Sequence, residues 1–423
     1  MSRLKSATLR QLNTYLISFA FGIIIYQILA GSKNTENTNY YKSTSTEIPQ
    51  DRSNRNIKKH LKVEVKSTSP QPLPTNLDGS LNIEKILEKT RKKIRHELIS
   101  YNFNASGVQK IDDLIMESGG KPIRSLIIST WRSGTTFLGG ILNAIPGNYY
   151  HYESLLYFGI VQIKGPPHSD KALSLIKNSF SCNFYDLKEY FEYGKGNTCQ
   201  FNYNSRLWEL CQHKKELCLD PVFVSKFCKM FPFQSMKLVR IRLQVLQELF
   251  EDKLLDNLNM VLLIRDPRGV MQSRSHHHWC KPSPDCFQPE LVCADMVSDY
   301  MAAGRVLHQY PGRLMVIRYE DLALNTNRTA YKLLKFLKLS ATPSVKKYLH
   351  SHTTVEKVGV SSTFRISRKM PFRWKKALNF SDVEKIQMAC KEAMDLWGYQ
   401  MAHNASHLAS KDFKPTRKFK VTQ

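Results

Sequence analysis

From residue 121 to about residue 400, the chain alternates short apolar runs with stretches whose apolar residues recur at helical spacing. The short runs predict buried strands over 125–129, 236–240, 260–264 and 314–319. The longer stretches predict helices over 135–145, 243–251, 268–273, 291–308, 330–337 and 382–397. Because strands that alternate with helices are typical of βαβ units, the pattern predicts an α/β fold with a central parallel sheet flanked by helices.

Residues 15–31 show a different pattern, an apolar stretch without charge. As a helix this stretch would span about 26 Å, which suits a thin bilayer of the early secretory pathway. Arg3, Lys5 and Arg10 precede it and predict a cytoplasmic N-terminus. We expect an uncleaved signal anchor, because the apolar core of a signal peptide is usually shorter; cleavage near residues 30–32 is the alternative. In either case the remainder of the chain is expected to be lumenal or extracellular.

These patterns divide the chain into five predicted parts. They are a cytoplasmic tail (1–14), a transmembrane signal anchor (15–31), a lumenal stem (32–120), a catalytic domain (121–405) and a basic tail (406–423). Up to about residue 80 the stem is rich in Ser, Thr, Asn, Lys and Pro, which is typical of a flexible linker. A helical pattern follows at 81–100; we favour packing on the domain over self-association, and homodimerisation stays open. Residues 411–423 carry five basic residues and one Asp, and we expect them to be disordered.

Composition and charge narrow the class of protein. Hydrophobic residues at 42% and charged residues at 23% exclude a wholly disordered, collagen-like or multi-span membrane protein. The formal net charge of +26 predicts an anionic partner, such as nucleic acid, a membrane surface, a phosphate-bearing cofactor or an acidic glycan. Glycosylation sequons at Asn104, Asn327, Asn379 and Asn404 support a lumenal location.

The nine cysteines also support a lumenal location. Eight of them lie within 182–293, which predicts disulfide-closed loops in an oxidising compartment, and the odd total leaves at least one unpaired within the chain. The alternative is zinc, held by the three histidines at 276–278 with Cys280 and Cys286. No Cys-x-x-Cys accompanies a His-x₃-His, so we expect disulfides and no metal.

The first candidate site follows the strand predicted at 125–129. Its residues are Arg132, Ser133, Gly134, Thr135, Thr136 and Phe137. The first turn of a helix that begins here would offer free N–H groups and the positive end of its dipole to an anion. Gly134 would let the backbone close on an oxyanion, and Arg132 could stabilise charge on a leaving phosphate. The Gly-x₄-Gly-Lys-Ser/Thr spacing of nucleotide kinases is absent, and an ordinary tight βα turn is the alternative.

A second transition from strand to helix contains Arg265 and Pro267. Pro267 suits the first turn of a helix, and Arg265 lies just past the strand's carboxyl end, where open α/β sheets place their ligands. Ser273 lies about two helical turns further on and would reach the same anion only if the chain folds back. The alternative for Arg265 and Arg268 is a solvated, salt-bridged helix start.

Together the two segments resemble those of a known family, the membrane-anchored carbohydrate sulfotransferases of the Golgi. The similarity is greatest to the group that sulfates the 6-hydroxyl of galactose, N-acetylgalactosamine or N-acetylglucosamine. The loop at 132–137 resembles the family's 5′-phosphosulfate loop, and residues 264–274 resemble its 3′-phosphate motif. Further matches lie at 237–240 and 311–322. The resemblance covers residues 121–400 and implies a P-loop-like sulfotransferase fold.

The resemblance also implies a donor and a set of roles. The donor is 3′-phosphoadenosine 5′-phosphosulfate, used without a metal. Arg132 and residues 133–137 would hold its 5′ end, while Arg265 and Ser273 would hold its 3′-phosphate. The implied partners are a glycan or proteoglycan acceptor and the Golgi membrane through one N-terminal helix, with no nucleic acid.

A base must accept the proton of the acceptor hydroxyl. By the resemblance, Glu153 is the catalytic carboxylate, alongside Arg132. We expect burial or neighbouring groups to raise the pKa of Glu153, so that it works near neutral pH. His151, two residues earlier and expected on the same face of a strand, is the rival base.

The basic, aromatic loop at 364–374 could cover the donor, and a solvated loop is the alternative.

Two other functions are alternatives to sulfuryl transfer. A nucleotide-dependent kinase of the secretory pathway predicts a loop Lys and metal-binding carboxylates, neither of which is evident. A catalytically silent, membrane-anchored glycan-binding protein would not need the base and loop hydroxyls that this chain retains. The sequence therefore favours a lumenal sulfotransferase that acts on a sugar hydroxyl.

Overall fold

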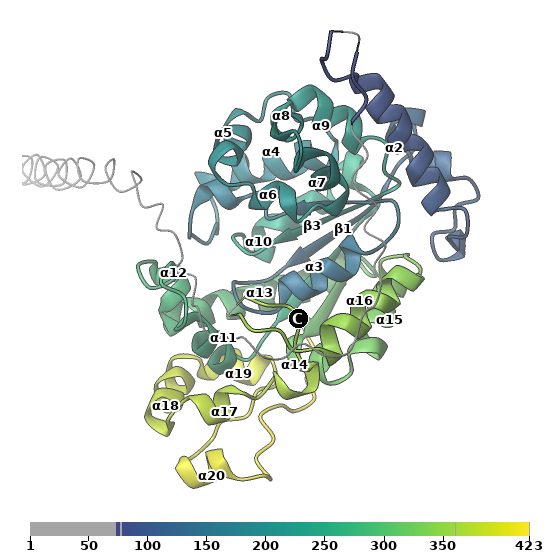
Figure 1. Cartoon of the computed structure of the whole chain (residues 1–423). Helices are drawn as coiled ribbons and strands as arrows, with labels where there is room; N and C mark the ends of the chain where they lie inside the picture. Colours follow the sequence, from purple (N-terminus) through teal and green to yellow (C-terminus); the bar gives the residue numbers. More distant parts are fainter. Residues whose placement is uncertain (1–72, 77, 360, 423) are drawn as a thin grey trace, which may run out of the picture. The chain divides into compact units, whose positions relative to one another are not determined.

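The computed structural model describes residues 73–76, 78–359 and 361–422 (Figure 1). Parallel strands form one sheet in the order β2-β3-β1-β4-β5. They are β1 (Ile123–Ile128), β2 (Asn148–Tyr152), β3 (Phe233–Leu238), β4 (Leu258–Ile264) and β5 (Leu314–Arg318). Every residue of β1, β3 and β4 is buried, as expected for a parallel sheet covered on both faces. The predicted sheet is confirmed, and β2 is the strand that the apolar pattern did not indicate.

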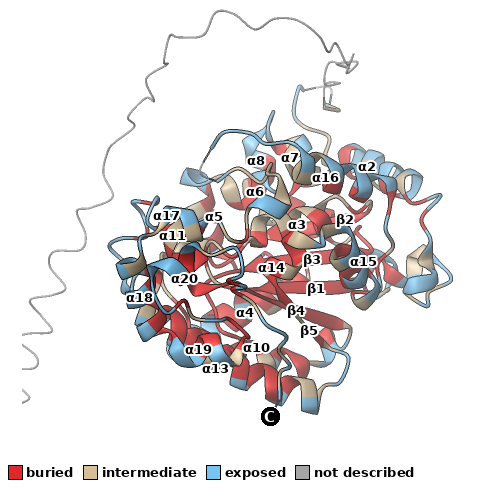
Figure 2. Cartoon of the chain, turned by 90° about the horizontal axis from the view of Figure 1, so that it is seen from below, coloured by how far each residue is buried: buried red, intermediate tan, exposed pale blue. Residues whose placement is uncertain are grey.

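Helices cover both faces of this sheet (Figure 2). On one side lie α3 (Thr135–Asn143) and α16 (Pro343–Thr354). On the other side lie α10 (Leu243–Leu246), α13 (Pro289–Gln309) and α19 (Lys391–Leu396). The chain leaves β1 through α3 towards one edge of the sheet, and it leaves β4 through α11 (Pro267–Arg274) and α13 towards the other edge. The carboxyl ends of β1 and β4 therefore form a topological switch point, where open α/β sheets bind ligands.

The remaining helices surround this core. They are α2 (Ile83–Glu97), α4 (His168–Phe180), α5 (Lys188–Gly196), α6 (Cys199–Asn202), α7 (Ser205–Cys211), α8 (Lys215–Leu219), α9 (Pro221–Cys228), α12 (Pro284–Phe287), α14 (Tyr319–Leu324), α15 (Thr326–Phe336), α17 (Trp374–Ala377), α18 (Phe380–Ala389) and α20 (Ala405–Ala409). The helix predicted at 382–397 is divided into α18 and α19 at Cys390, which is bonded to Cys293. The helix predicted at 243–251 continues beyond α10 as a 3₁₀ turn at Gln247–Phe250.

Disulfides close several of the loops between these elements. The bonds are Cys182–Cys228, Cys211–Cys218, Cys280–Cys286 and Cys293–Cys390. Three of them join cysteines within 182–293, as predicted, whereas the fourth reaches Cys390 outside that segment. Cys199 is the unpaired cysteine that the odd total required.

Ordered structure extends past both ends of the predicted catalytic domain. Before residue 121, α2 buries Ile86, Leu87 and Ile94 in the same core as the sheet. After residue 405, Phe413 packs in a cluster with Trp374. The difference from the predicted 121–405 boundaries arises because apolar residues in both flanking segments contribute to cores.

The predicted membrane anchor at 15–31 and the stem up to residue 72 lie outside the described residues. Within the part of the chain that the structure describes, no helix combines the length and the apolar character needed to cross a bilayer.

Candidate active site

The loop after β1 turns sharply into α3. Arg132 has φ +68° and Gly134 has φ +94°, both in the left-handed region. A Cβ atom on Gly134 would lie 2.7 Å from a ring carbon of Tyr319, so only glycine fits between the loop and that ring. Helix α3 begins directly afterwards at Thr135. The first N–H groups of a helix have no partner within it, and here they lie beside the switch point.

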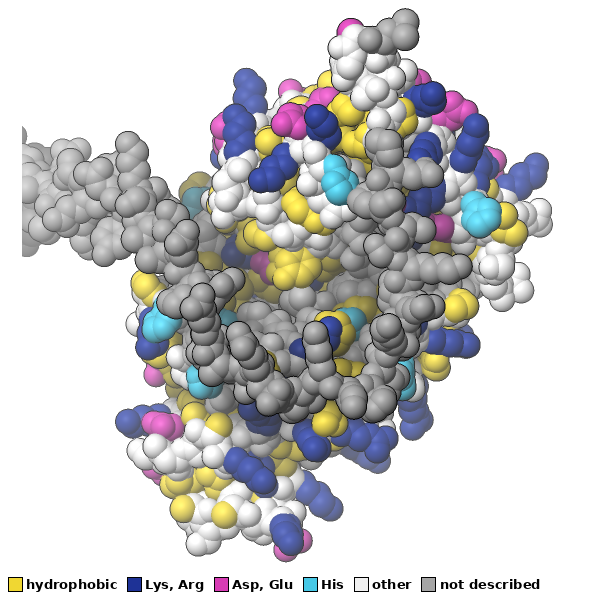
Figure 3. Space-filling view, viewed as in Figure 1, with side chains coloured by type: hydrophobic (Ala, Val, Ile, Leu, Met, Phe, Trp, Pro, Cys, Tyr) yellow, Lys and Arg dark blue, Asp and Glu magenta, His cyan; other side chains and the backbone are white. Residues whose placement is uncertain are grey.

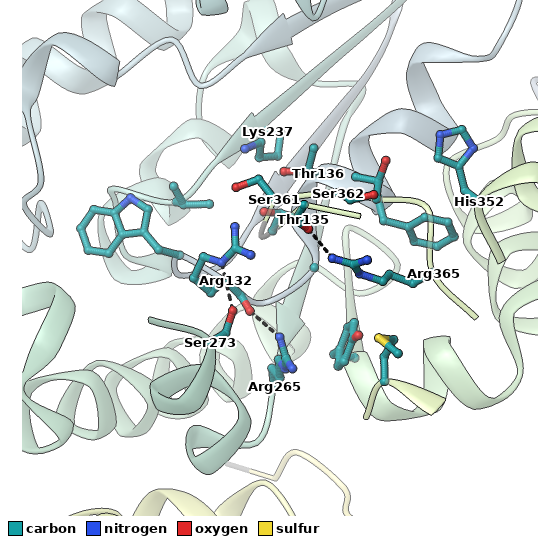
Figure 4. A pocket seen from close by; sticks show the side chains of 18 of the residues that line it. Arg132, Thr135, Thr136, Lys237, Arg265, Ser273, His352, Ser361, Ser362 and Arg365 are labelled. Carbon is teal, nitrogen blue, oxygen red and sulfur yellow. Dashed lines mark hydrogen bonds between the residues drawn. The ribbon is translucent and has the colours of Figure 1, made fainter. Parts of the chain in front are cut away.

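The two predicted anion sites meet at Arg132. Its Nε donates a hydrogen bond of 3.1 Å to Ser273 Oγ on α11, and Arg265 Nη1 donates one of 2.7 Å to the Arg132 carbonyl oxygen (Figure 4). The chain therefore folds back so that Ser273 reaches the loop that contains Arg132. Burial and the nearby charge of Arg265 lower the pKa of Arg132. Two guanidinium groups brought together in this way create a strongly positive site for an anion.

Arg265 is fixed by the aromatic ring of Tyr319. The guanidinium carbon lies 4.4 Å from the ring centroid. Within the described residues its Nε atom is buried and has no hydrogen-bond partner, which leaves a donor for a ligand. By contrast, Arg268 pairs with Asp266, the N-cap of α11, and both side chains are fully buried. Arg268 therefore has a structural role. Because its side chain is buried, the solvated, salt-bridged helix start that was the alternative is not observed.

A cavity of about 900 Å³ opens at these strand ends. On the face of the molecule seen in Figure 3, Lys and Arg side chains gather on the lower half. The predicted site residues that line the cavity are Arg132, Gly134, Thr135, Thr136, Phe137, Glu153, Arg265 and Ser273. Ser133 is the exception, because its side chain is fully buried behind the loop. Its Oγ has no hydrogen-bond partner within the described residues.

Glu153 lies just past the carboxyl end of β2 with φ +43°. Its two carboxylate oxygens accept hydrogen bonds from Lys237 Nζ and Arg240 Nη1, one each. Burial alone would raise the pKa of Glu153, but the two cations outweigh it and hold the pKa below its usual value. The predicted rise in pKa is therefore wrong. The two cations thus favour the ionised form of the carboxylate, which is the form that a proton acceptor needs.

The rival base does not share this position. His151 lies on β2 and packs among the rings of Tyr149, Phe180 and Phe184. Burial lowers its pKa to about 3, and it does not line the cavity. The positive φ of Glu153 turns that side chain away from the alternation of the strand, so the expected common face with His151 is not observed.

The basic loop near the C-terminus borders the same cavity. Arg365, Ser367 and Arg373 line it, as the expectation of a donor-covering loop requires. The positive charge of Arg365 also contributes to lowering the pKa of Arg132. Ser361 and Ser362, from the segment just before Arg365, line the cavity as well, and all three are labelled in Figure 4.

Sequence reasoning missed several residues of the site. Lys237, Arg240 and Tyr319 were noted only as parts of the family matches at 237–240 and 311–322, and all three line the cavity. A lysine inside a buried strand such as β3 is itself a signal, because a buried charge requires a partner. Nothing in the local pattern indicates that this partner is Glu153.

The histidines at 276–278 do not form the zinc site that was weighed. Cys280 and Cys286 are bonded to each other, so neither thiolate is available. Among the described residues, no group of three or more His, Cys, Asp or Glu side chains is arranged to hold a metal ion.

Residues 122–398 match the family described as "Sulfotransferase domain". Carbohydrate sulfotransferase 3 of Homo sapiens is 27% identical over 331 residues, covering 68% of this chain and 69% of that protein. Carbohydrate sulfotransferase 4 of Mus musculus is 26% identical over 324 residues, covering 67% and 83%. The solved sulfotransferase domain of the Synechococcus PCC 7002 olefin synthase aligns with a TM-score of 0.36 at 15% identity over 63% of this chain and 94% of that one, a likeness too low to add to the assignment. The family match spans both anion sites and Glu153, and the chain therefore belongs to the sulfotransferase family, with carbohydrate sulfotransferases as its curated relatives.

Proposed function

We propose that the protein transfers the sulfuryl group of 3′-phosphoadenosine 5′-phosphosulfate to the 6-hydroxyl of galactose, N-acetylgalactosamine or N-acetylglucosamine in a glycan. One observation carries the proposal. Two cationic sites at neighbouring strand ends join at Arg132 and share one cavity with an ionised Glu153. The curated relatives support a glycan as the acceptor.

The chain's own groups fit such a donor, which carries phosphate at both ends of its ribose. The amides at the start of α3, with Thr135 and Thr136, would hold the 5′ end. The buried, unpartnered Ser133 hydroxyl lies behind this loop. Arg265 and Ser273 would hold the 3′-phosphate, with the free Arg265 Nε as a further donor.

When bound, the donor supplies an activated sulfuryl group. Glu153 accepts the proton of the acceptor hydroxyl at a carboxylate oxygen, and Lys237 and Arg240 keep that carboxylate ionised beforehand. Arg132 places positive charge where negative charge develops on the leaving phosphate. The wall of the cavity orients both partners, which lowers the entropic cost of the reaction.

We place this activity in the Golgi lumen, on a protein held in the membrane by residues 15–31. Four disulfides support an oxidising compartment. The sequon residues Asn104, Asn327, Asn379 and Asn404 are all exposed, which agrees with a lumenal face.

The test is to incubate the full-length protein with donor carrying radiolabelled sulfate and a panel of desulfated glycans. Labelled product, with the sulfate located at C6 by mass spectrometry, is the expected result. Donor binding without transfer to any glycan would contradict the enzymatic function and favour the silent glycan-binding protein. Transfer of phosphate from ATP would favour the kinase.

A further inference from the structure

Two aromatic side chains on the cavity wall are exposed. Trp279 exposes 41% of its surface and Tyr203 exposes 40%, and both line the cavity. An exposed aromatic ring does not contribute the folding free energy that its burial would provide. Two such rings in one cavity indicate a surface kept for a ligand.

Trp279 is held in place by its surroundings. Its Nε1 donates a hydrogen bond of 3.2 Å to His277 Nδ1, and its ring meets Trp131 edge-on with centroids 6.5 Å apart. The next residue, Cys280, is bonded to Cys286. These restraints order the ring before any ligand binds, which reduces the entropy lost on binding.

Tyr203 is fixed in a comparable way on a different element. Its ring stacks on Tyr152 with centroids 3.8 Å apart and an interplanar angle of 10°. Its backbone carbonyl accepts a hydrogen bond of 2.8 Å from Asn143 Nδ2. Lys237 Nζ lies 4.1 Å from the centroid of the Tyr152 ring. The stack of Tyr203 on Tyr152 therefore contacts Lys237, one of the two partners of Glu153.

Each exposed ring therefore contacts the immediate neighbour of a candidate catalytic residue. Trp131, under Trp279, directly precedes Arg132, and Tyr152, under Tyr203, directly precedes Glu153. A ligand that packs on Tyr203 would lie beside the position where the proton is accepted, and one that packs on Trp279 would lie beside Arg132. The first position is where the acceptor, rather than the adenosine of the donor, has to be.

A pyranose unit has the chemistry that such a surface recognises. It presents an apolar C–H face, which packs on an aromatic ring, and a rim of hydroxyl groups, which needs hydrogen-bonding partners. Gln272 and His276 line the same cavity and contact each other at 3.0 Å, so both can supply such partners.

We propose that Trp279 and Tyr203 form the acceptor-binding platform of the cavity, where pyranose units of the glycan stack so that the target hydroxyl meets Glu153. This inference rests on the proposed function and extends it, because it assigns acceptor recognition to two residues with no role in the family motifs found above. The platform determines acceptor affinity and leaves the affinity for the donor unchanged.

The test uses the full-length Trp279→Ala and Tyr203→Ala variants. Trp279→Phe keeps an aromatic ring, and Tyr331→Ala removes an equally exposed ring on α15, outside the cavity. We expect the KM for desulfated keratan or chondroitin oligosaccharides to rise at least tenfold in both cavity alanine variants, to rise by less in Trp279→Phe, and to change less than threefold in the Tyr331→Ala control. The Kd for adenosine 3′,5′-bisphosphate, measured by calorimetry, should stay within twofold of wild type in all four.

An unchanged acceptor KM in both alanine variants would overturn the platform, and so would a tenfold loss of bisphosphate affinity, which would assign the rings to the donor. Calorimetric titration of the same oligosaccharides into the bisphosphate complex tests the platform apart from turnover. If wild type binds the oligosaccharides but transfers nothing, the proposed enzyme function fails. Loss of oligosaccharide binding in Trp279→Ala would then still support the platform, and retained binding would overturn it.

Discussion

Arg132 Nε and Ser273 Oγ are joined by a hydrogen bond of 3.1 Å, although 141 positions separate the two residues in the chain. One residue follows β1 and the other lies on the helix after β4, so the contact ties together the two strand ends at the switch point. A ligand with two phosphates that binds both sites would replace or share this contact. Donor binding is therefore expected to depend on both partners.

Loss of the 3′-phosphate contacts should weaken nucleotide binding in proportion to their charge. We expect Ser273→Ala to raise the Kd for adenosine 3′,5′-bisphosphate about tenfold, and Arg265→Ala about 100-fold, because hydrogen bonds to charged groups contribute more than neutral ones. Calorimetry on the full-length variants measures both values. Arg305→Ala, which removes an exposed arginine on α13, serves as the control and should bind as wild type does. Equal affinities in all three variants would contradict the assignment.

A side chain at position 134 should close the anion site. Gly134→Ala places a Cβ against the ring of Tyr319 at positive φ, whereas Gly312→Ala has a similar φ of +79° and open space around it. Both variants should lose about 1 kcal/mol of unfolding free energy from backbone strain, and Gly134→Ala should lose more because its Cβ also meets the Tyr319 ring. Only Gly134→Ala should lose bisphosphate affinity, by more than tenfold. A similar loss in Gly312→Ala would show that strain alone, rather than the Tyr319 contact, is responsible.

The proton acceptor should be ionised across the physiological range. Glu153→Gln should lower kcat at least 100-fold without changing the bisphosphate Kd, since general-base catalysis commonly contributes that much. Glu248→Gln, an exposed glutamate outside the cavity, is the control. Retention of near-normal turnover by Glu153→Gln would remove this residue from the mechanism.

The pH profile tests the cause of that ionisation. Because Lys237 and Arg240 hold the pKa of Glu153 low, wild-type kcat/KM should stay level as the pH falls from 8 towards 5. In Lys237→Met the effect of burial is less opposed, the pKa of Glu153 rises, and the acidic limb of the profile should move towards neutral pH. Profiles of kcat/KM against pH for wild type and Lys237→Met measure this shift. An unmoved acidic limb would show that Lys237 does not tune the base.

A second buried carboxylate should make stability depend on pH. Burial, followed by the nearby charge of Asp266, raises the pKa of Glu320 from 4.5 to about 7, while its oxygens accept hydrogen bonds from the Asp266 amide and the Tyr399 hydroxyl. The folded protein holds this proton more tightly than the unfolded chain, so the stabilisation is present below pH 4.5 and is lost as the pH rises to 7. The loss is about 3 kcal/mol at most. Urea titrations of wild type and Glu320→Gln should show a smaller decline in the variant, and parallel declines would contradict the assignment.

The sequence was sufficient for the elements whose residues carry a strong local pattern. β1 and β4 both end in an apolar run that is followed by a glycine or proline, so both strand-to-helix transitions, with Arg132 and Arg265, were predictable. No apolar run marks β2, because its residues are polar and aromatic, and rings contributed by α4 and α9 help to bury them. The break between α18 and α19 depends on a disulfide to a distant cysteine, which local spacing does not encode.

For a related reason, the direction of the pKa shift of Glu153 could not be predicted from the sequence. Glu153 and Lys237 are 84 positions apart and meet because β2 pairs with β3 in register. Burial alone predicts a raised pKa, and only the pairing of the strands shows that two cations reverse the shift.

The most direct test of the account is a crystal structure of the protein with adenosine 3′,5′-bisphosphate. We expect the 5′-phosphate at the amides that begin α3, beside Thr135, and the 3′-phosphate on Arg265 and Ser273. Glu153 should remain unobstructed at the far end of the cavity. A nucleotide bound elsewhere, or one that engages a single strand end and leaves Arg265 free, would contradict the central claim.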